Sequence, residues 1–346
     1  MIADILDQFP KQQCEAARSA LAAALGSASP TVMTPLSGGV SGASLFLCEV
    51  AGRRIVLRIE GAASPLRNPH QYVAMRIAAD AGLAPRIHAI DETAGVAVID
   101  FIAEQPLTAF PGGPAALARA LGEMVRRLQA TPIFPHFIDY PDIVSRIWAH
   151  ICRSGLFAPG VLDAHSRRLA EIRSVYAWDP ANAVSSHNDL LPRNLLFDGQ
   201  RLWLIDWESA CRSDPLVDIA TTLDNFAPTP ELEAVVLRAW LGREPDRQLR
   251  ERLSLIRALT RLFYAGVQFS AVAAGPRSAP ETDLAAPTLS ELQQALRDGR
   301  LQPDALETRH VLGKMFLAAF LFGTAAPGLP PPFSQFKLKH GPIAPK

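Results

Sequence analysis

The pattern of apolar and polar positions predicts a small β-sheet in the first hundred residues. Short apolar runs occupy 31–36, 43–50 and 53–60, and Gly-containing turns separate them. Two more runs, at 86–90 and 95–102, are joined by the segment DETA. Runs of this length, bounded by turn residues, are typical of strands. We expect the five runs to form a mostly antiparallel sheet.

Helical spacing is found twice in this strand-rich part of the chain. Residues 11–26 are Ala-rich and end at a glycine. Residues 68–81 follow a second helical pattern, with Asn68 as the N-cap, Pro69 at the first helical position and Gly82 at the stop. Proline is tolerated there because its missing N–H would have no partner in any case. These signals predict two helices.

Helical patterns dominate after residue 102. Apolar side chains recur on one face of residues 114–129, and helical patterns return in 142–176 and 214–322. The last residues, 323–346, are Pro-rich and resemble an extended or poorly ordered tail. We place a lobe boundary near residues 102–107. The expected units are residues 1–102, residues 103–322 and a tail of residues 323–346.

Length and charge limit the class of protein. A chain of 346 residues favours two lobes over one small core. Lys plus Arg equals Asp plus Glu, 34 each, so no overall field favours nucleic acid or an anionic membrane. Four widely spaced cysteines favour reduced thiols, and the N-terminus lacks the pattern of a signal peptide. The most apolar run, 311–322, is too short to span a bilayer. We therefore expect a cytoplasmic protein that binds neither nucleic acid nor membrane.

The segment 185–208 places polar residues around two short apolar runs. Asp189 and Asn194 lie on a loop that leads into the first run, and Asp206 ends the second run after a DGQ turn. Two strands joined by a tight turn would bring Asn194 and Asp206 together. Their oxygens suit Mg²⁺, and Asp189 is placed to accept a proton from a hydroxyl. The alternative is an Asx-rich loop with local hydrogen bonds, but the full spacing favours the catalytic interpretation.

The spacing His-Asn-Asp-x4-Asn from His187, followed by Asp-Trp-Glu from Asp206, resembles a known catalytic segment. It is similar to that of the aminoglycoside phosphotransferase and choline kinase superfamily, relatives of the protein kinases. The resemblance implies a kinase-like, two-lobed α+β fold with a small antiparallel-sheet lobe and a larger, mainly helical lobe. It implies Asp189 as catalytic base, with Asn194 and Asp206 as Mg²⁺ ligands. His187 would support the loop, and Asp218 would brace it.

The resemblance also implies an ATP site in the strand-rich lobe. The Gly- and Ser-rich segment 36–47 would let backbone N–H groups approach phosphates, although it is not a P-loop, because no Lys-Ser/Thr follows its glycines. Arg58 lies where the family has the cation that contacts the α/β-phosphates, and a surface arginine is the alternative. Residues 98–102 resemble the interlobe hinge that reads adenine. The expected cofactor-binding residues are Ser37, Gly39, Ser41, Gly42, Arg58, Asp100, Phe101 and Ile102.

Two positions depart from the family pattern. The helix at 68–81 should offer a Glu to pair with the phosphate-binding cation, yet residues 64–79 contain no acidic residue. Gln71 or His70 lies near the expected position, so the ion pair is weakened, replaced or supplied from elsewhere. Gln129 replaces a histidine that is usual in the family. Neither departure removes a catalytic group.

The acceptor side of the site is less clearly marked. Trp207-Glu208 is closer to the choline, ethanolamine and thiamine kinase branch than to typical aminoglycoside enzymes. Glu208 would attract a cation, and Trp207 would pack beneath the site. Phe263, Tyr264 and Trp240 would supply rings for cation–π contacts with a quaternary ammonium group. Aromatic residues at helical spacing are also typical of a hydrophobic core.

The resulting hypothesis is an ATP- and Mg²⁺-dependent kinase that phosphorylates the hydroxyl of a choline- or ethanolamine-like amino alcohol. Arginine outnumbers acidic residues in 238–261, which disfavours a polycationic aminoglycoside, although a solvated helix face fits equally well. One alternative is a phosphotransferase for another metabolite or an antibiotic, such as thiamine, a sugar, homoserine or an aminoglycoside. The others are a non-catalytic nucleotide-binding relative and a helical interaction protein. The oligomeric state and the role of the tail are not indicated.

Overall fold

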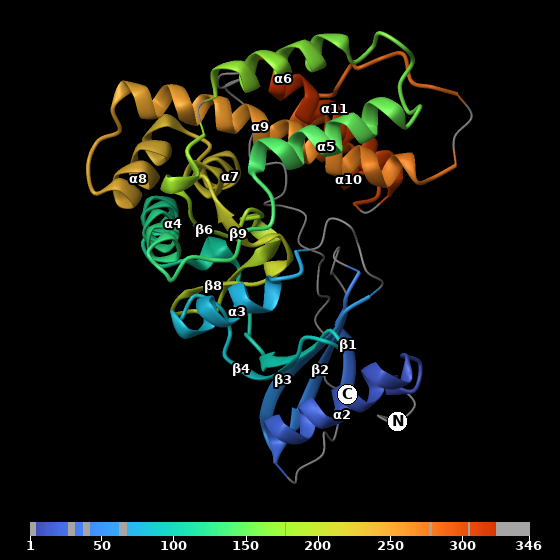
Figure 1. Ribbon diagram of the computed structural model, residues 1–346, viewed down its shortest axis with the longest axis vertical. Coiled ribbons are helices and arrows are strands. Elements are labelled where there is room, and N and C mark those ends of the chain that lie inside the picture. Colours follow the sequence, from blue (N-terminus) through green and yellow to red (C-terminus); the bar gives the residue numbers. More distant parts are fainter. Residues whose placement is uncertain are drawn as a thin grey trace.

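A computed structural model describes most of the chain and reveals a two-lobed architecture (Figure 1). The described residues are 5–26, 32–36, 42–61, 68–176, 178–276, 279–303 and 305–322. A five-stranded sheet with two helices forms the smaller lobe, and a mainly helical assembly forms the larger one. The predicted α+β class is therefore confirmed. The tail at 323–346 lies outside the described residues.

The five predicted strands form one antiparallel sheet in the order β1-β2-β3-β5-β4. The bounds are Val32–Leu36 for β1, Ser44–Val50 for β2, Arg53–Ile59 for β3, Ile87–Asp91 for β4 and Val96–Asp100 for β5. Side chains of a strand alternate between the two faces. On β2 this buries Phe46, Cys48 and Val50 while their neighbours stay half-buried.

Two helices accompany the sheet, as predicted. They are α2, Lys11–Leu25, and α3, Gln71–Asp80. The small and apolar side chains Ala17 and Leu21 of α2 join Leu57 of the sheet in one core. Burial of this apolar surface holds α2 on the sheet.

The start of α3 differs from the prediction. The helix begins at Gln71 with His70 as its N-cap, so Asn68 does not cap it. Instead the Asn68 carboxamide accepts a hydrogen bond from the His70 N–H (2.9 Å) and donates one to the Ala210 carbonyl of the larger lobe. A side chain expected to serve its own helix therefore joins the two lobes.

Long helices build the larger lobe around α9. The helices are α4 Gly113–Gln129, α5 Tyr140–Arg153, α6 Asp163–Val175, α7 Leu216–Phe226, α8 Pro230–Leu241, α9 Arg247–Ala273, α10 Leu289–Arg297 and α11 Leu306–Leu321. α5, α7 and α11 all pack against α9. At the α9–α11 contact, a Cβ added to Gly313 would lie 2.5 Å from the Phe269 ring, so glycine permits the close approach. Most of the apolar run at 311–322 lies in α11 and is buried, as expected, whereas Leu321 and Phe322 at its end are exposed.

Short strands and 3₁₀ turns lie between α6 and α7. The strands are β6 Val184–Ser186, β7 Leu195–Phe197, β8 Leu202–Leu204 and β9 Cys211–Ser213, and the turns are η2 Pro180–Asn182, η3 Pro192–Asn194 and η4 Trp207–Ser209. β6 pairs with β9, and β7 pairs with β8, both antiparallel. The predicted polar segment thus becomes two small ladders packed beside helices.

The connection between the lobes runs from the end of β5 at Asp100 to the start of α4 at Gly113 and includes η1, Leu107–Ala109. Within it, the Gln105 N–H donates to the Phe197 carbonyl at 2.7 Å. The boundary expected near 102–107 falls in this connection, and the three-unit division remains a prediction. Among the described helices, none is long and apolar enough to cross a membrane.

Candidate active site

The β7–β8 hairpin brings Asn194 and Asp206 to the same end of one small ladder. Leu195 pairs with Leu204, and the Ile205 N–H donates to the Asn194 carbonyl at 3.0 Å. Both leucines are completely buried, so burial of their apolar surface holds the hairpin in place. The hydrophobic runs therefore position the polar residues that follow them.

Asp189 is held by three side chains. Its Oδ2 accepts hydrogen bonds from Arg193 (2.9 Å) and Asn194 (2.8 Å), and its Oδ1 accepts one from the Tyr264 hydroxyl (3.1 Å). Burial, and then the Asp189 charge, raise the pKa of Tyr264 well above its ordinary value. Tyr264 consequently stays protonated and remains a donor. These contacts leave the Asp189 carboxylate only 15% exposed and in one orientation.

The donor set of Asn194 and Asp206 fits a magnesium ion. Both hydrogen bonds of the Asn194 amide nitrogen go to Asp189, at 2.8 Å each, and among the described residues its amide oxygen accepts none. The Oδ1 atom of Asp206 is buried, and no hydrogen-bond partner for it is found among the described residues. One amide oxygen and one carboxylate are thus left for a hard cation.

The electrostatic surroundings of Asp206 also favour a bound cation. Burial, and then the neighbouring Asp189, raise the pKa of Asp206, while Arg58 partly opposes the rise. Asp206 also adopts a left-handed backbone conformation, with φ 67°, which is uncommon for a non-glycine residue. A buried anion next to another anion is costly without a cation. Magnesium bound there would supply that charge.

A second buried aspartate braces the loop that carries Asp189. The two carboxylate oxygens of Asp218 accept the N–H groups of His187 and Asn188, at 2.8 Å each. The His187 ring donates through Nε2 to the Ile205 carbonyl at 3.0 Å and so ties the loop to the hairpin. Asn188 needs this support, because its φ is +60°.

Three predicted aromatic residues lie in different surroundings. Trp207 is 5% exposed and packs against the His187 ring, with centroids 4.8 Å apart, so it contributes to packing beneath the loop. Trp240 is buried and donates to the Gln129 side chain at 2.8 Å, which places it among structural contacts. Phe263 is half-buried beside a pocket. Glu208 is half-buried too, and its carbonyl accepts the Asn68 N–H.

Gln129, the replacement for a histidine, has an identifiable role. Its amide oxygen accepts from Trp240, and its amide nitrogen donates to the Pro215 carbonyl at 2.8 Å. It therefore connects α4 and α8 to the segment that precedes Asp218. The departure leaves the support of the catalytic loop in place.

Part of the expected nucleotide site is described. Ser37, Gly39 and Ser41 lie outside the described residues. Gly42 has φ +72°, and a Cβ added to Gly61 would lie 2.2 Å from the Gly42 carbonyl oxygen, so the two glycines meet at the end of the β2–β3 ladder.

The backbone N–H groups of the expected hinge differ in whether they have partners. The Asp100 N–H donates to the Arg86 carbonyl, and the Phe101 N–H donates to the Arg54 carbonyl. The Ile102 N–H makes no hydrogen bond to the described residues. The Arg54 guanidinium also covers the Phe101 ring at 4.7 Å. Of the three predicted residues, Ile102 is therefore the one with an N–H available to a ligand.

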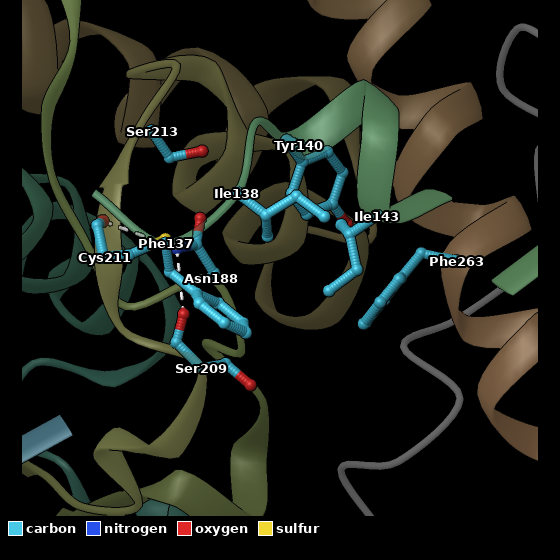
Figure 2. Close-up of a pocket in the computed structure, with 9 residues that line it drawn as sticks. All are labelled: Phe137, Ile138, Tyr140, Ile143, Asn188, Ser209, Cys211, Ser213 and Phe263. Atoms are coloured by element: carbon cyan, nitrogen blue, oxygen red, sulfur yellow. Dashed lines mark hydrogen bonds between the residues drawn. The ribbon is translucent and has the colours of Figure 1, made fainter. Parts of the chain in front are cut away.

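A pocket opens beside the catalytic loop (Figure 2). Its lining residues are Phe137, Ile138, Tyr140, Ile143, Asn188, Ser209, Cys211, Ser213 and Phe263. The rings of Tyr140 and Phe263 lie 5.8 Å apart, and the Asn188 amide nitrogen donates to Ser209 and Cys211 carbonyls. The Tyr140 hydroxyl and the Asn188 amide oxygen are buried, and neither has a partner among the described residues.

Sequence reasoning did not identify several residues of this site. Arg193 donates a hydrogen bond to Asp189. Its position four residues after Asp189 in the sequence could have indicated this contact. Asn188 follows His187 directly and could have been singled out as well. Tyr140 lies far away in sequence and carries no local signal. In the structure it lines the same pocket as Asn188. Burial, and then the charges of Asp189 and Asp218, raise its pKa.

Comparison with known proteins supports the predicted relationship. A family described as the phosphotransferase enzyme family matches residues 32–256, more than half of the chain. The curated LicA protein of Haemophilus influenzae is 53% identical over 57 residues, which are 16% of this chain and 21% of LicA. This match therefore spans about a fifth of the curated relative.

Solved structures resemble the whole fold. A choline/ethanolamine kinase family protein from Mesorhizobium loti has a TM-score of 0.61 and 25% identity, covering 90% of this chain and 100% of that one. Choline kinase LicA from Streptococcus pneumoniae has a TM-score of 0.60 and 17% identity, covering 86% and 96%. The predicted kinase-like fold and the predicted choline kinase branch are thereby confirmed. The chain belongs to the phosphotransferase enzyme family.

Proposed function

We propose that this chain transfers the γ-phosphoryl group of ATP, with Mg²⁺, to the hydroxyl of a small amino alcohol of the choline or ethanolamine class. The observation that carries the proposal is the buried Oδ1 of Asp206, which has no partner among the described residues, beside an oriented Asp189. Buried polar atoms in proteins normally have hydrogen-bond partners. An aspartate that only supports the fold would therefore be expected to have partners for both of its buried oxygens.

Each residue has a defined part in this reaction. Bound ATP would donate its γ-phosphoryl group and leave as ADP, and Mg²⁺ held at Asn194 and Asp206 would neutralise charge on the phosphates. Asp189, held by Arg193 and Tyr264, orients the acceptor hydroxyl and takes its proton. Asn194 and Asp206 provide the two oxygens for the metal. Positioning of this kind, rather than covalent chemistry, supplies most of the catalysis in phosphoryl transfer.

The pocket beside Asn188 supports an acceptor with one positive charge. Its aromatic members can face an ammonium group, and each such contact is worth about 0.5–2 kcal/mol. Among the described residues that line it there is no carboxylate, but the charges of Asp189 and Asp218 raise the pKa of Tyr140. A single cation suits aromatic walls backed by buried anions, whereas a polycation would need several acidic partners.

The pocket must widen to admit a whole acceptor. Its cavity volume is about 30 Å³, enough for roughly one or two water molecules. Several lining side chains are half-buried, namely Phe137, Ile138, Ile143 and Phe263. Acceptor binding would therefore be accompanied by displacement of one or more of these side chains.

The test is ATP turnover with choline, ethanolamine and a neutral diol of similar size, for the wild type and Asp189→Asn. We expect turnover with an amino alcohol and a loss of about 10²–10⁴-fold in kcat for Asp189→Asn, because the base is removed. Asp142→Asn, in an exposed ion pair on α5, is the matched control and should keep full activity.

Other outcomes would redirect the assignment. Turnover with the neutral diol alone would replace the amino alcohol with another metabolite. Binding of Mg·ATP without turnover on any alcohol would indicate a non-catalytic relative. Full activity of Asp189→Asn would refute the role of the base.

A further inference from the structure

Arg58 has an acidic partner directly after its own strand rather than on α3. Its Nη1 lies 3.2 Å from Oε1 of Glu60, the residue just after β3. Residues two apart on an extended chain point to the same side, so the two side chains meet without any bend. Both are protected, with 12% and 13% of their side chains exposed. This pair is thus screened much less than an exposed one.

Gln71 of α3 completes a three-membered group. Its amide nitrogen donates to Glu60 Oε1 at 2.6 Å, and its amide oxygen lies 3.5 Å from Arg58 Nη2. Gln71 is itself only 5% exposed. The helix therefore contacts both charges through a neutral bridge, at the position where an acidic residue was expected.

The surrounding backbone holds Glu60 in place. The Gln13 side chain of α2 donates to its carbonyl at 2.9 Å, and its N–H donates to the Gly95 carbonyl at 2.8 Å. Gly95 has φ +69°, and a Cβ there would lie 2.9 Å from the Glu60 Cβ. Only glycine allows this approach without strain. Together with Gln71 of α3, the Gln13 side chain and the turn at Gly95 make three separate segments that fix the position of Glu60.

The group lies next to the segment that follows Asp206. Gln71, which contacts Arg58, is three residues after Asn68, and Asn68 donates hydrogen bonds to the Glu208 and Ala210 carbonyls of the larger lobe. A guanidinium held at this junction of the two lobes can contact the phosphates of a nucleotide bound beside Asp206.

We propose that Glu60 is the positioning residue for Arg58, in place of an acidic residue on α3, and that Gln71 is the neutral bridge between them. The inference rests on the proposed function, because it assigns Arg58 to the phosphates of ATP. Glu60 keeps the guanidinium aimed at the nucleotide, and Gln71 fixes the distance between α3 and the sheet.

The experiment exchanges the charge between the two positions. Glu60→Gln, Gln71→Glu and the double variant are compared by calorimetric titration with Mg·ADP and by the KM for ATP. We expect Glu60→Gln to raise both the Kd for Mg·ADP and the KM for ATP by about tenfold, the effect of losing one charged hydrogen bond. The double variant, which moves the carboxylate onto α3 opposite Arg58, should recover binding to within about threefold of the wild type. The KM for the acceptor should not change.

A matched control and two contrary results make the test decisive. Glu92→Gln removes an exposed partner of Arg76 in the same lobe and should leave Mg·ADP binding unchanged. Unchanged nucleotide binding by Glu60→Gln, or no recovery in a folded double variant, would overturn the role of Glu60. Failure of the wild type to bind Mg·ADP would instead overturn the proposed function, and this inference with it.

Discussion

The end of the β7–β8 hairpin and the start of α7 each carry an aspartate with a buried carboxylate oxygen, but the two have different hydrogen-bond partners. Asp218 is fully buried, and both of its oxygens accept backbone N–H groups. Asp206 is half-buried, and its Oδ1 is buried without a partner among the described residues. Burial raises the pKa of both carboxyls. The difference separates a brace, whose hydrogen bonds are complete within the described residues, from a carboxylate that is left available to the proposed cation.

The largest expected effect comes from Asp206→Asn. Loss of the metal ligand should reduce turnover by at least about a hundredfold. It should also abolish the rise in Tm that Mg·ADP gives the wild type. Asp298→Asn, in an exposed pair with Arg300, is the control and should retain both properties. Retention of both by Asp206→Asn would contradict the assignment of Asp206.

The same substitution should stabilise the protein when no metal is present. The folded-state pKa of Asp206 is raised, so its ionised form opposes folding at neutral pH. This penalty is complete above the raised pKa and is lost as the pH falls toward about 4, the ordinary value for aspartate. Urea unfolding in the presence of EDTA should therefore give Asp206→Asn a higher free energy of unfolding than the wild type at pH 8. Near pH 4 the two free energies should be equal. A variant that is less stable at pH 8 would remove the contrast with Asp218.

Asp218→Ala should have the opposite effect on stability. It leaves the buried N–H groups of His187 and Asn188 without acceptors, which costs about 2–4 kcal/mol of unfolding free energy. Asp163→Ala is the matched control, because Asp163 also lies in the first turn of a helix but is exposed. Its loss should cost less than about 1 kcal/mol. Equal losses in urea unfolding would mean that Asp218 acts only as a helix-terminal charge.

The smallest effects are expected from substitutions of two tyrosines. Like the two aspartates, they differ in whether their polar group has a partner among the described residues. Tyr264→Phe removes a donor to Asp189 and should lower kcat by about three- to tenfold, the value of one hydrogen bond. Tyr140→Phe removes a hydroxyl that has no partner among the described residues, so stability should be unchanged. Steady-state kinetics should show an altered acceptor KM for Tyr140→Phe alone. A fall in kcat that is equal for both variants would remove the distinction between them.

The grouping of the three proposed site residues could be predicted because it depends on local geometry. Asp189, Asn194 and Asp206 lie within eighteen residues of one another, 189–206, and a tight hairpin leaves few ways to arrange them. The strands of the small lobe were predictable for a similar reason, since short apolar runs between turns have few alternatives. The branch of the family followed from two residues after Asp206, and the comparisons confirm it.

The partners of these residues could not be predicted in the same way. Tyr264 reaches Asp189 across 75 positions of sequence because α9 packs beside the catalytic loop. The N-cap assigned to Asn68 was wrong, since its side chain binds Ala210 of the other lobe, and no local pattern records such a contact. Contacts of this kind depend on how whole helices pack, which local propensity does not determine.

The sequence by itself determined which chemical groups are available and their order along the chain, because spacing and short turns decide both. The tertiary structure decided which of these groups are satisfied. Packing of distant elements gives Asp218 two N–H partners and leaves an oxygen of Asp206 with none among the described residues. Packing also places Gln71 against Arg58 and Glu60. Whether a carboxylate supports the fold or binds a ligand depends on the neighbours that packing brings to it.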